Sequence, residues 1–140
     1  MQPILTLTDA PDNNVERVIG AGLAGYNLEK AGLVDNRALA VLLTEPETGE
    51  LLGGLSGRTS LGLLFIDIFH VPAMFRGTGI GSRIIKMAED EARARGCAAS
   101  FLVTINFQAP AFYQRHGYEE FGRIETTPDI YRVFMRKILA

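Results

Sequence analysis

The sequence predicts a mixed α/β protein, classed as α+β in some schemes, with a mostly antiparallel sheet of six or seven strands and about four helices. Most of its apolar runs are joined by short turns, as in antiparallel hairpins. The exception is the apolar strand Phe65 to Val71, which is followed by an amphipathic helix, Ile80 to Arg95, and then by a second strand, Ala98 to Ile105. Because a crossover through a helix returns the chain in the same direction, these two strands are expected to form a parallel pair at the centre of the sheet.

The chain is predicted to begin with a short strand, Ile4 to Thr8, followed by a helix that Asp12 or Asn13 can cap. Glycine is about 1 kcal/mol less favourable than alanine inside a helix. This helix is therefore expected to break where it carries Gly20, Gly22 and Gly25. The following residues, Tyr26 to Gly32, are interpreted as a helical turn or a loop.

Two hairpins account for the remaining strands. The first joins Ala38 to Thr44 with Leu51 to Ser60 through the turn Glu45 to Gly49. The second joins Tyr118 to Ile124 with Tyr131 to Leu139 at the end of the chain. Glycine weakens a strand, so a bulge, or a close approach of another backbone or of a ligand, is expected at the strand glycines Gly53, Gly54 and Gly57.

Length and composition exclude several classes of protein. The 140 residues suggest one domain, residues 1–140, and a formal net charge of −2 provides no basic surface for nucleic acid. The N-terminus has no charged leader, and no apolar run approaches the roughly 18 residues of a membrane span, so we expect a cytoplasmic protein without a membrane partner. Cys97 is the single cysteine and the two histidines are far apart, so neither a disulfide nor a metal site is expected.

The connection after the central strand has the chemistry of an anion site. Pro72 ends the strand because it has no N–H to donate, and Arg76 is then followed by glycines at three alternate positions, Gly77, Gly79 and Gly81. Unpaired N–H groups at a helix start favour phosphate, and an arginine adds charge. The spacing does not fit the G-x-G-x-x-G dinucleotide loop, and the Gly-Lys-Ser/Thr of a phosphate loop is absent.

Two motifs resemble those of the GNAT N-acetyltransferase superfamily. Arg76 to Gly81, R-G-T-G-I-G, resembles its (Q/R)-x-x-G-x-(G/A) acyl-CoA signature. Asn106 to Tyr118, N-F-Q-A-P-A-F-Y-Q-R-H-G-Y, resembles its N-x-x-A-x-x-F/L-Y-x-x-x-G-F/Y element. The resemblance is best over Phe65 to Phe121, while the flanks agree only in the order of their elements.

The resemblance implies transfer of an acetyl group from acetyl-CoA to the primary amine of a small molecule or peptide in a ternary complex. It implies that Tyr113 protonates the departing thiolate and that Asn106 binds the pantetheine arm. A backbone N–H near Val71 would stabilise the oxyanion, because the family separates its central strand from the parallel neighbour. The implied coenzyme-binding residues are Phe69, His70, Val71, Arg76, Gly77, Thr78, Gly79, Ile80, Gly81, Ser82, Asn106, Ala109 and Phe112.

The acceptor side of the reaction is less well defined by the sequence. A base must take a proton from the amine, and Asp67 is the candidate because it is a carboxylate on an apolar strand, expected to face the same side as Phe65 and Phe69. Members of the family that use a strand carboxylate often carry Glu two residues earlier, so Asp67 can equally be a structural, hydrogen-bonded residue. The resemblance also makes Tyr26 and Asn27 candidates for the acceptor wall, against the alternative that both are solvated.

Two other functions remain open at this point. The fold can serve as a non-catalytic acyl-CoA sensor, or the glycines can hold another phosphate ligand in a binding module. Packing alone also accounts for Tyr113, and His70 is expected to point to the opposite face from Val71. The sequence identifies neither the acceptor amine nor the oligomeric state, so a homodimer is possible.

Overall fold

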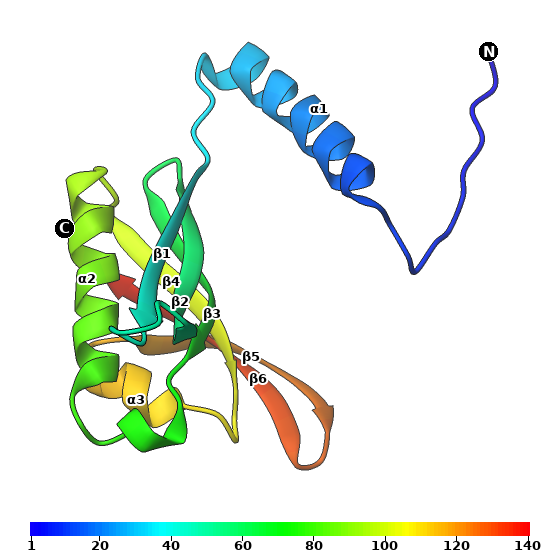
Figure 1. The fold of residues 1–140 in the computed structure, drawn as a ribbon. Helices are drawn as coiled ribbons and strands as arrows, with labels where there is room; N and C mark the ends of the chain where they lie inside the picture. The colour runs from blue at the N-terminus through cyan, green and yellow to red at the C-terminus, as the bar shows by residue number, and fades with distance from the viewer. The chain divides into compact units, whose positions relative to one another are not determined.

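The structure is a computed structural model that describes all residues from 1 to 140. The chain divides into two compact units, residues 1–34 and residues 35–140, which are described separately (Figure 1). The expectation that residues 1–140 form a single domain stays a prediction.

The first unit consists of an extended segment and one helix, α1 (Asn13–Ala31). The Asp12 carboxylate caps it by accepting hydrogen bonds from the N–H groups of Asn14 and Val15, as predicted. Two other expectations are wrong. The helix continues through its three glycines to Gly32, whose left-handed conformation ends it. No strand forms at Ile4 to Thr8, since a strand needs a hydrogen-bonded neighbour.

The second unit is built on one six-stranded sheet whose strand order is β1-β2-β3-β4-β6-β5. The strands are β1 (Arg37–Thr44), β2 (Leu51–Ser60), β3 (Leu63–His70), β4 (Ala99–Ile105), β5 (Glu119–Thr127) and β6 (Ile130–Ile138). Every neighbouring pair is antiparallel except β3 and β4, which are parallel. The predicted mixed sheet with a central parallel pair is therefore confirmed.

Two helices complete this unit, α2 (Ile80–Ala94) and α3 (Pro110–Arg115), with a short 3₁₀ turn at Ala73–Phe75. α2 runs alongside the strands, and α3 lies near its N-terminal end (Figure 1). α2 ends where predicted, with Gly96 in the left-handed conformation. Its buried residues are Ile84, Ile85, Ala88, Glu89 and Ala92.

The core lies between α2, α3 and the sheet. Leu64 of β3, Leu102 of β4 and Met135 of β6 are almost completely buried there, together with Ile85 of α2. Burial of each such side chain contributes roughly 1.5 to 3 kcal/mol of hydrophobic stabilisation. Tyr113 of α3 belongs to the same cluster, so the helix that carries the second motif is fixed to the core.

A bulge interrupts the pairing of β2 and β3. Ser56 pairs with Ile68 whereas Gly57 pairs with Ile66, so Asp67 is an extra residue in β3. A Cβ atom on Gly57 would lie 2.1 Å from the carbonyl oxygen of Phe65, and only glycine allows that approach. The predicted bulge and close backbone approach at the strand glycines are both confirmed.

The bulge also reverses which residues face the core. Leu64 and Ile66 are buried before it, and Phe69 packs against the same core cluster after it. Phe65 instead contacts the Phe101 ring, with 4.7 Å between ring centroids. Our expectation that Phe65 and Phe69 face the same side is therefore wrong, because the extra residue changes the strand's alternation by one.

Candidate active site

The parallel pair at the centre of the sheet separates partway along its length. β3 and β4 pair only from Leu63 with Ala99 to Ile66 with Leu102, although both strands continue beyond that point. Backbone groups that lose a partner in this way cost about 1–3 kcal/mol each if they are also kept from water. The separation opens a cavity of about 850 Å³, so a ligand or solvent can reach these groups.

The cavity brings together most of the predicted site residues. Those that line it are Asp67, Phe69, His70, Val71, Arg76, Gly77, Gly79, Gly81, Ser82, Ala109, Phe112 and Tyr113. His70 lines it together with Val71, despite the expectation that the two point to opposite faces. Thr78, Ile80 and Asn106 do not line it, and Tyr26 and Asn27 belong to α1 of the first unit. The roles assigned to all of these residues stay predictions.

The N-terminus of α2 forms one end of the cavity. Gly79 occupies the cap position in the left-handed conformation, with φ of 87°, and no side chain caps the helix. The N–H groups of the first turn are therefore available to an anion, and the helix dipole favours negative charge there. Gly81 allows α3 to pack closely, since a Cβ atom on it would lie 3.3 Å from the ring of Phe112.

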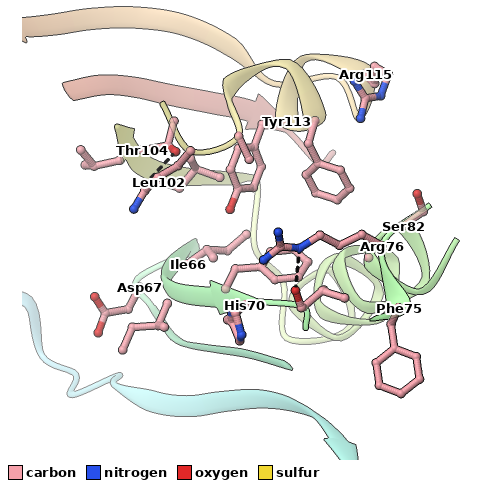
Figure 2. A pocket seen from close by; sticks show the side chains of 18 of the residues that line it. Ile66, Asp67, His70, Phe75, Arg76, Ser82, Leu102, Thr104, Tyr113 and Arg115 are labelled. Atoms are coloured by element: carbon pink, nitrogen blue, oxygen red, sulfur yellow. Dashed lines mark hydrogen bonds between the residues drawn. The ribbon is translucent and has the colours of Figure 1, made fainter. Parts of the chain in front are cut away.

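Arg76 links this end of the cavity to the end of β3. Its Nε donates a hydrogen bond of 3.0 Å to the backbone carbonyl of Val71 (Figure 2). The same guanidinium has two further nitrogens, which can donate to a bound anion. Arg76 therefore combines a structural contact with a positive charge next to the α2 N-terminus.

Tyr113 extends into the cavity from α3. Its ring is enclosed by three aromatic neighbours, Phe69, Phe112 and Tyr118, with centroids 5.4 to 6.3 Å away. Its hydroxyl points into the space between the two separated strands (Figure 2). Burial raises the pKa of Tyr113 to about 12, so the hydroxyl remains protonated, and able to donate, throughout the neutral and mildly alkaline range.

Asn106 follows β4 directly and is occupied by structural hydrogen bonds. Its Oδ1 accepts from the N–H of Tyr131 at 3.0 Å, and its Nδ2 donates to the carbonyl of Asp129 at 3.1 Å. The side chain therefore holds the hairpin between β5 and β6 against the end of β4. Contact between Asn106 and pantetheine stays a prediction that requires these bonds to be exchanged or shared.

The charges of the cavity are unevenly distributed. Asp67 lies on one side, and the two arginines, Arg76 and Arg115, lie on the opposite side (Figure 2). Asp67 is exposed. The bulge places it on the strand where pairing with β4 has just ended. The arrangement suits a molecule whose anionic part lies at α2 and whose cationic part lies near Asp67.

Several residues of the cavity were not predicted from the sequence. Leu102 and Thr104 of β4 contribute because the strands separate, and a single strand pattern contains no signal for that separation. Gln108 was also missed. Its Oε1 accepts a hydrogen bond of 3.0 Å from the N–H of Ile105 and so shapes the turn after β4. Arg115 was missed as well, although the two-residue distance from Tyr113 was visible in the motif.

No group of three or more His, Cys, Asp or Glu side chains is arranged to hold a metal ion. No helix has the length and apolar character needed to cross a membrane.

Known proteins resemble this chain in sequence and in fold. Residues 13–118 match the sequence profile of the Acetyltransferase (GNAT) family. "Acetyltransferase Atu2258" from Agrobacterium fabrum is 36% identical over 118 residues, which cover 84% of this chain and 85% of the relative. "Blasticidin-S acetyltransferase" from Streptomyces morookaense is 42% identical over 104 residues, which cover 72% and 76% of the two chains.

A solved structure supports the same assignment. The crystal structure of a putative acetyltransferase from Agrobacterium tumefaciens superimposes with a TM-score of 0.88 at 31% identity, covering 97% of this chain and 99% of the other. The separated strands, the glycine-lined helix start and the buried tyrosine therefore occur in a chain whose sequence and fold both match acetyltransferases. The protein belongs to the GNAT acetyltransferase family.

Proposed function

We propose that this protein transfers an acetyl group from acetyl-CoA to a primary amine of a small molecule. The observation that carries the proposal is the cavity between β3 and β4, which has the α2 N-terminus at one end and Asp67 at the other. A relative named for blasticidin S supports a small-molecule acceptor. The amine nitrogen attacks the thioester carbon, an amide bond forms, the carbon–sulfur bond breaks, and CoA leaves as the thiol.

The donor occupies the cavity in one orientation. Its diphosphate lies on the first turn of α2, where unpaired N–H groups and Arg76 provide donors and positive charge. Its pantetheine arm lies between the separated strands and hydrogen-bonds the backbone groups that β3 and β4 do not give to each other. The thioester then lies next to the hydroxyl of Tyr113. Holding the donor in this way removes much of the entropic cost of bringing the reactants together.

Tyr113 assists departure of the sulfur. Its pKa of about 12 is higher than that of a free thiol, about 8.5, so complete proton transfer to a free thiolate is unfavourable by roughly 5 kcal/mol. The hydroxyl therefore acts mainly by donating a hydrogen bond to the sulfur as negative charge develops on it, and the departing thiolate takes its proton from solvent. Its contribution is accordingly placed at the lower end of the usual range for acid catalysis, about 10²-fold.

Asp67 acts on the acceptor. An alkyl amine with a pKa near about 10 is mostly protonated at neutral pH, so it arrives as a cation and must lose a proton before it attacks. The exposed carboxylate of Asp67 attracts that cation and accepts its proton, directly or through a water molecule.

The function is tested by measuring release of CoA thiol from acetyl-CoA in the presence of a panel of primary amines, with the acetylated product identified by mass spectrometry. We expect release that depends on the amine and yields one acetamide for each thiol. Binding of acetyl-CoA with no amine-dependent release, across a panel that includes small molecules and peptides, would instead identify a sensor.

Replacement of Asp67 by Asn is expected to lower kcat by about 10- to 100-fold at neutral pH and to leave the Kd for CoA unchanged. The loss should shrink as pH rises toward the pKa of the amine, because less of the amine then needs a base. Initial rates at saturating substrates across pH 6 to 10, together with CoA calorimetry, measure both effects. Glu47→Gln, in the exposed turn between β1 and β2, is the control. Wild-type turnover by Asp67→Asn across this range would make Asp67 a structural residue.

Replacement of Tyr113 by Phe is expected to lower kcat by about 10²-fold while stability and CoA affinity barely change, because the ring and its packing are retained. Burial raises its pKa to about 12, so Tyr113 should cause no falling limb in the wild-type pH profile below about pH 10. Tyr131→Phe, which alters a tyrosine outside the cavity, is the matched control. If Tyr113→Phe keeps kcat within about threefold of wild type when acyl transfer limits the rate, the hydroxyl has no role in catalysis.

A further inference from the structure

Arg115 is a positive charge in the cavity that the proposed reaction has not yet used. It occupies the last turn of α3, its side chain is exposed, and it lines the cavity. The structure contains six ion pairs, and Arg115 takes part in none of them. Asp67 is the only acidic residue among those that line the cavity, and it lies on the opposite side (Figure 2). Arg115 therefore has no carboxylate to neutralise it within the site.

Two contacts hold this turn of α3 against the first turn of α2, and a third joins the two residues of the α3 side that make them. The ring of Phe112 lies where a Cβ atom on Gly81 would be 3.3 Å away. Ser82 Oγ and His116 Nε2 are 3.0 Å apart, within hydrogen-bond distance. The rings of Phe112 and His116 have centroids 4.6 Å apart. Phe112 and His116, which precede and follow Arg115 in the sequence, both contact α2. Their contacts therefore set the position of Arg115 relative to the α2 N-terminus.

The guanidinium itself is also partly positioned. Its central carbon lies 6.0 Å from the centroid of the Phe112 ring, at the outer limit of a cation–π contact. Figure 2 shows Arg115 on α3, at the same end of the cavity as Ser82 and Arg76 and away from Asp67. A basic residue at a helix C-terminus is common because it complements the helix dipole, and that effect accounts for a charge on this turn. The helix dipole of α3 does not explain why this charge also lines the cavity, close to the N-terminus of α2.

We propose that Arg115 binds a phosphate group of the donor, so that the diphosphate is held from two sides. One phosphate lies on the N–H groups of the α2 first turn, and the guanidinium of Arg115 bonds the other from α3. A guanidinium matches phosphate geometry with two parallel donors, which an ammonium cannot do. The inference rests on the proposed function, because it requires acetyl-CoA as the donor.

This arrangement gives the site a preference among thioester donors. A nucleotide-linked pantetheine carries a diphosphate and can satisfy both the α2 N-terminus and Arg115. A pantetheine joined to a carrier protein through a single phosphate satisfies only one of them. Arg115 is therefore a specificity residue for the free coenzyme, and its contribution appears in donor binding and not in the chemical step.

The test combines calorimetry with CoA and turnover of two donors, acetyl-CoA and S-acetylpantetheine, which has no phosphate. Arg115→Gln should weaken CoA binding by about 10- to 100-fold, the range of a charge-assisted hydrogen bond. Arg115→Lys should lie between Arg115→Gln and wild type. The KM for S-acetylpantetheine should be the same in all three proteins, and kcat at saturating acetyl-CoA should be unchanged. Arg83→Gln is the matched control, since Arg83 is an exposed arginine of the α2 first turn that does not line the cavity.

The outcomes separate this inference from the function on which it rests. Wild-type CoA affinity in Arg115→Gln, or an equal loss with acetyl-CoA and with S-acetylpantetheine, would overturn the role of Arg115 and leave the transferase proposal intact. An equal loss in Arg83→Gln and Arg115→Gln would also overturn it, because general surface charge would then explain the effect. Absence of CoA binding by the wild-type protein would overturn the proposed function, and the role of Arg115 with it.

Discussion

The site depends on the interruption of backbone pairing between β3 and β4. A parallel pair inside a sheet would ordinarily continue along both strands, since unpaired buried N–H and C=O groups are costly. Here the pairing ends at Ile66 and Leu102, and the next residue of β3 is the bulge residue Asp67. The bulge is accommodated on the other side by Gly57, where no Cβ atom fits. Gly57 in β2 thus allows the bulge in β3, and the bulge lies where the two parallel strands separate.

The parts of the protein that depend on local chemistry were predictable from the sequence. Asp12 caps α1, Gly96 follows the end of α2, and Gly79 begins α2 in a conformation that suits glycine. The strand order followed from short turns and from one helical crossover. The two motifs placed Arg76 and Tyr113 in one cavity although 36 residues separate them in the sequence.

The errors and omissions have physical causes that lie outside a single segment. The alternation of β3 was misread because a bulge depends on the neighbouring strand, which a period-two pattern does not show. The predicted break in α1 was wrong because it rested on helix propensity alone, which is a weak determinant. The bonds of Asn106 to the hairpin connect residues more than twenty positions apart, and no sequence spacing predicts them. The charge of Arg115 became informative only when its missing partner and its position at the cavity were visible.

The central claim is that the opening between β3 and β4, together with the α2 N-terminus, holds the donor. Titration of the isotopically labelled protein with CoA, followed by backbone amide NMR, tests it most directly. Our account predicts the largest amide shifts in three segments, Phe69 to Val71, Gly77 to Ser82 and Val103 to Thr104, with little change at the tip of the β5–β6 hairpin. Saturable binding whose shifts lie on other elements, with those three segments unperturbed, would contradict it.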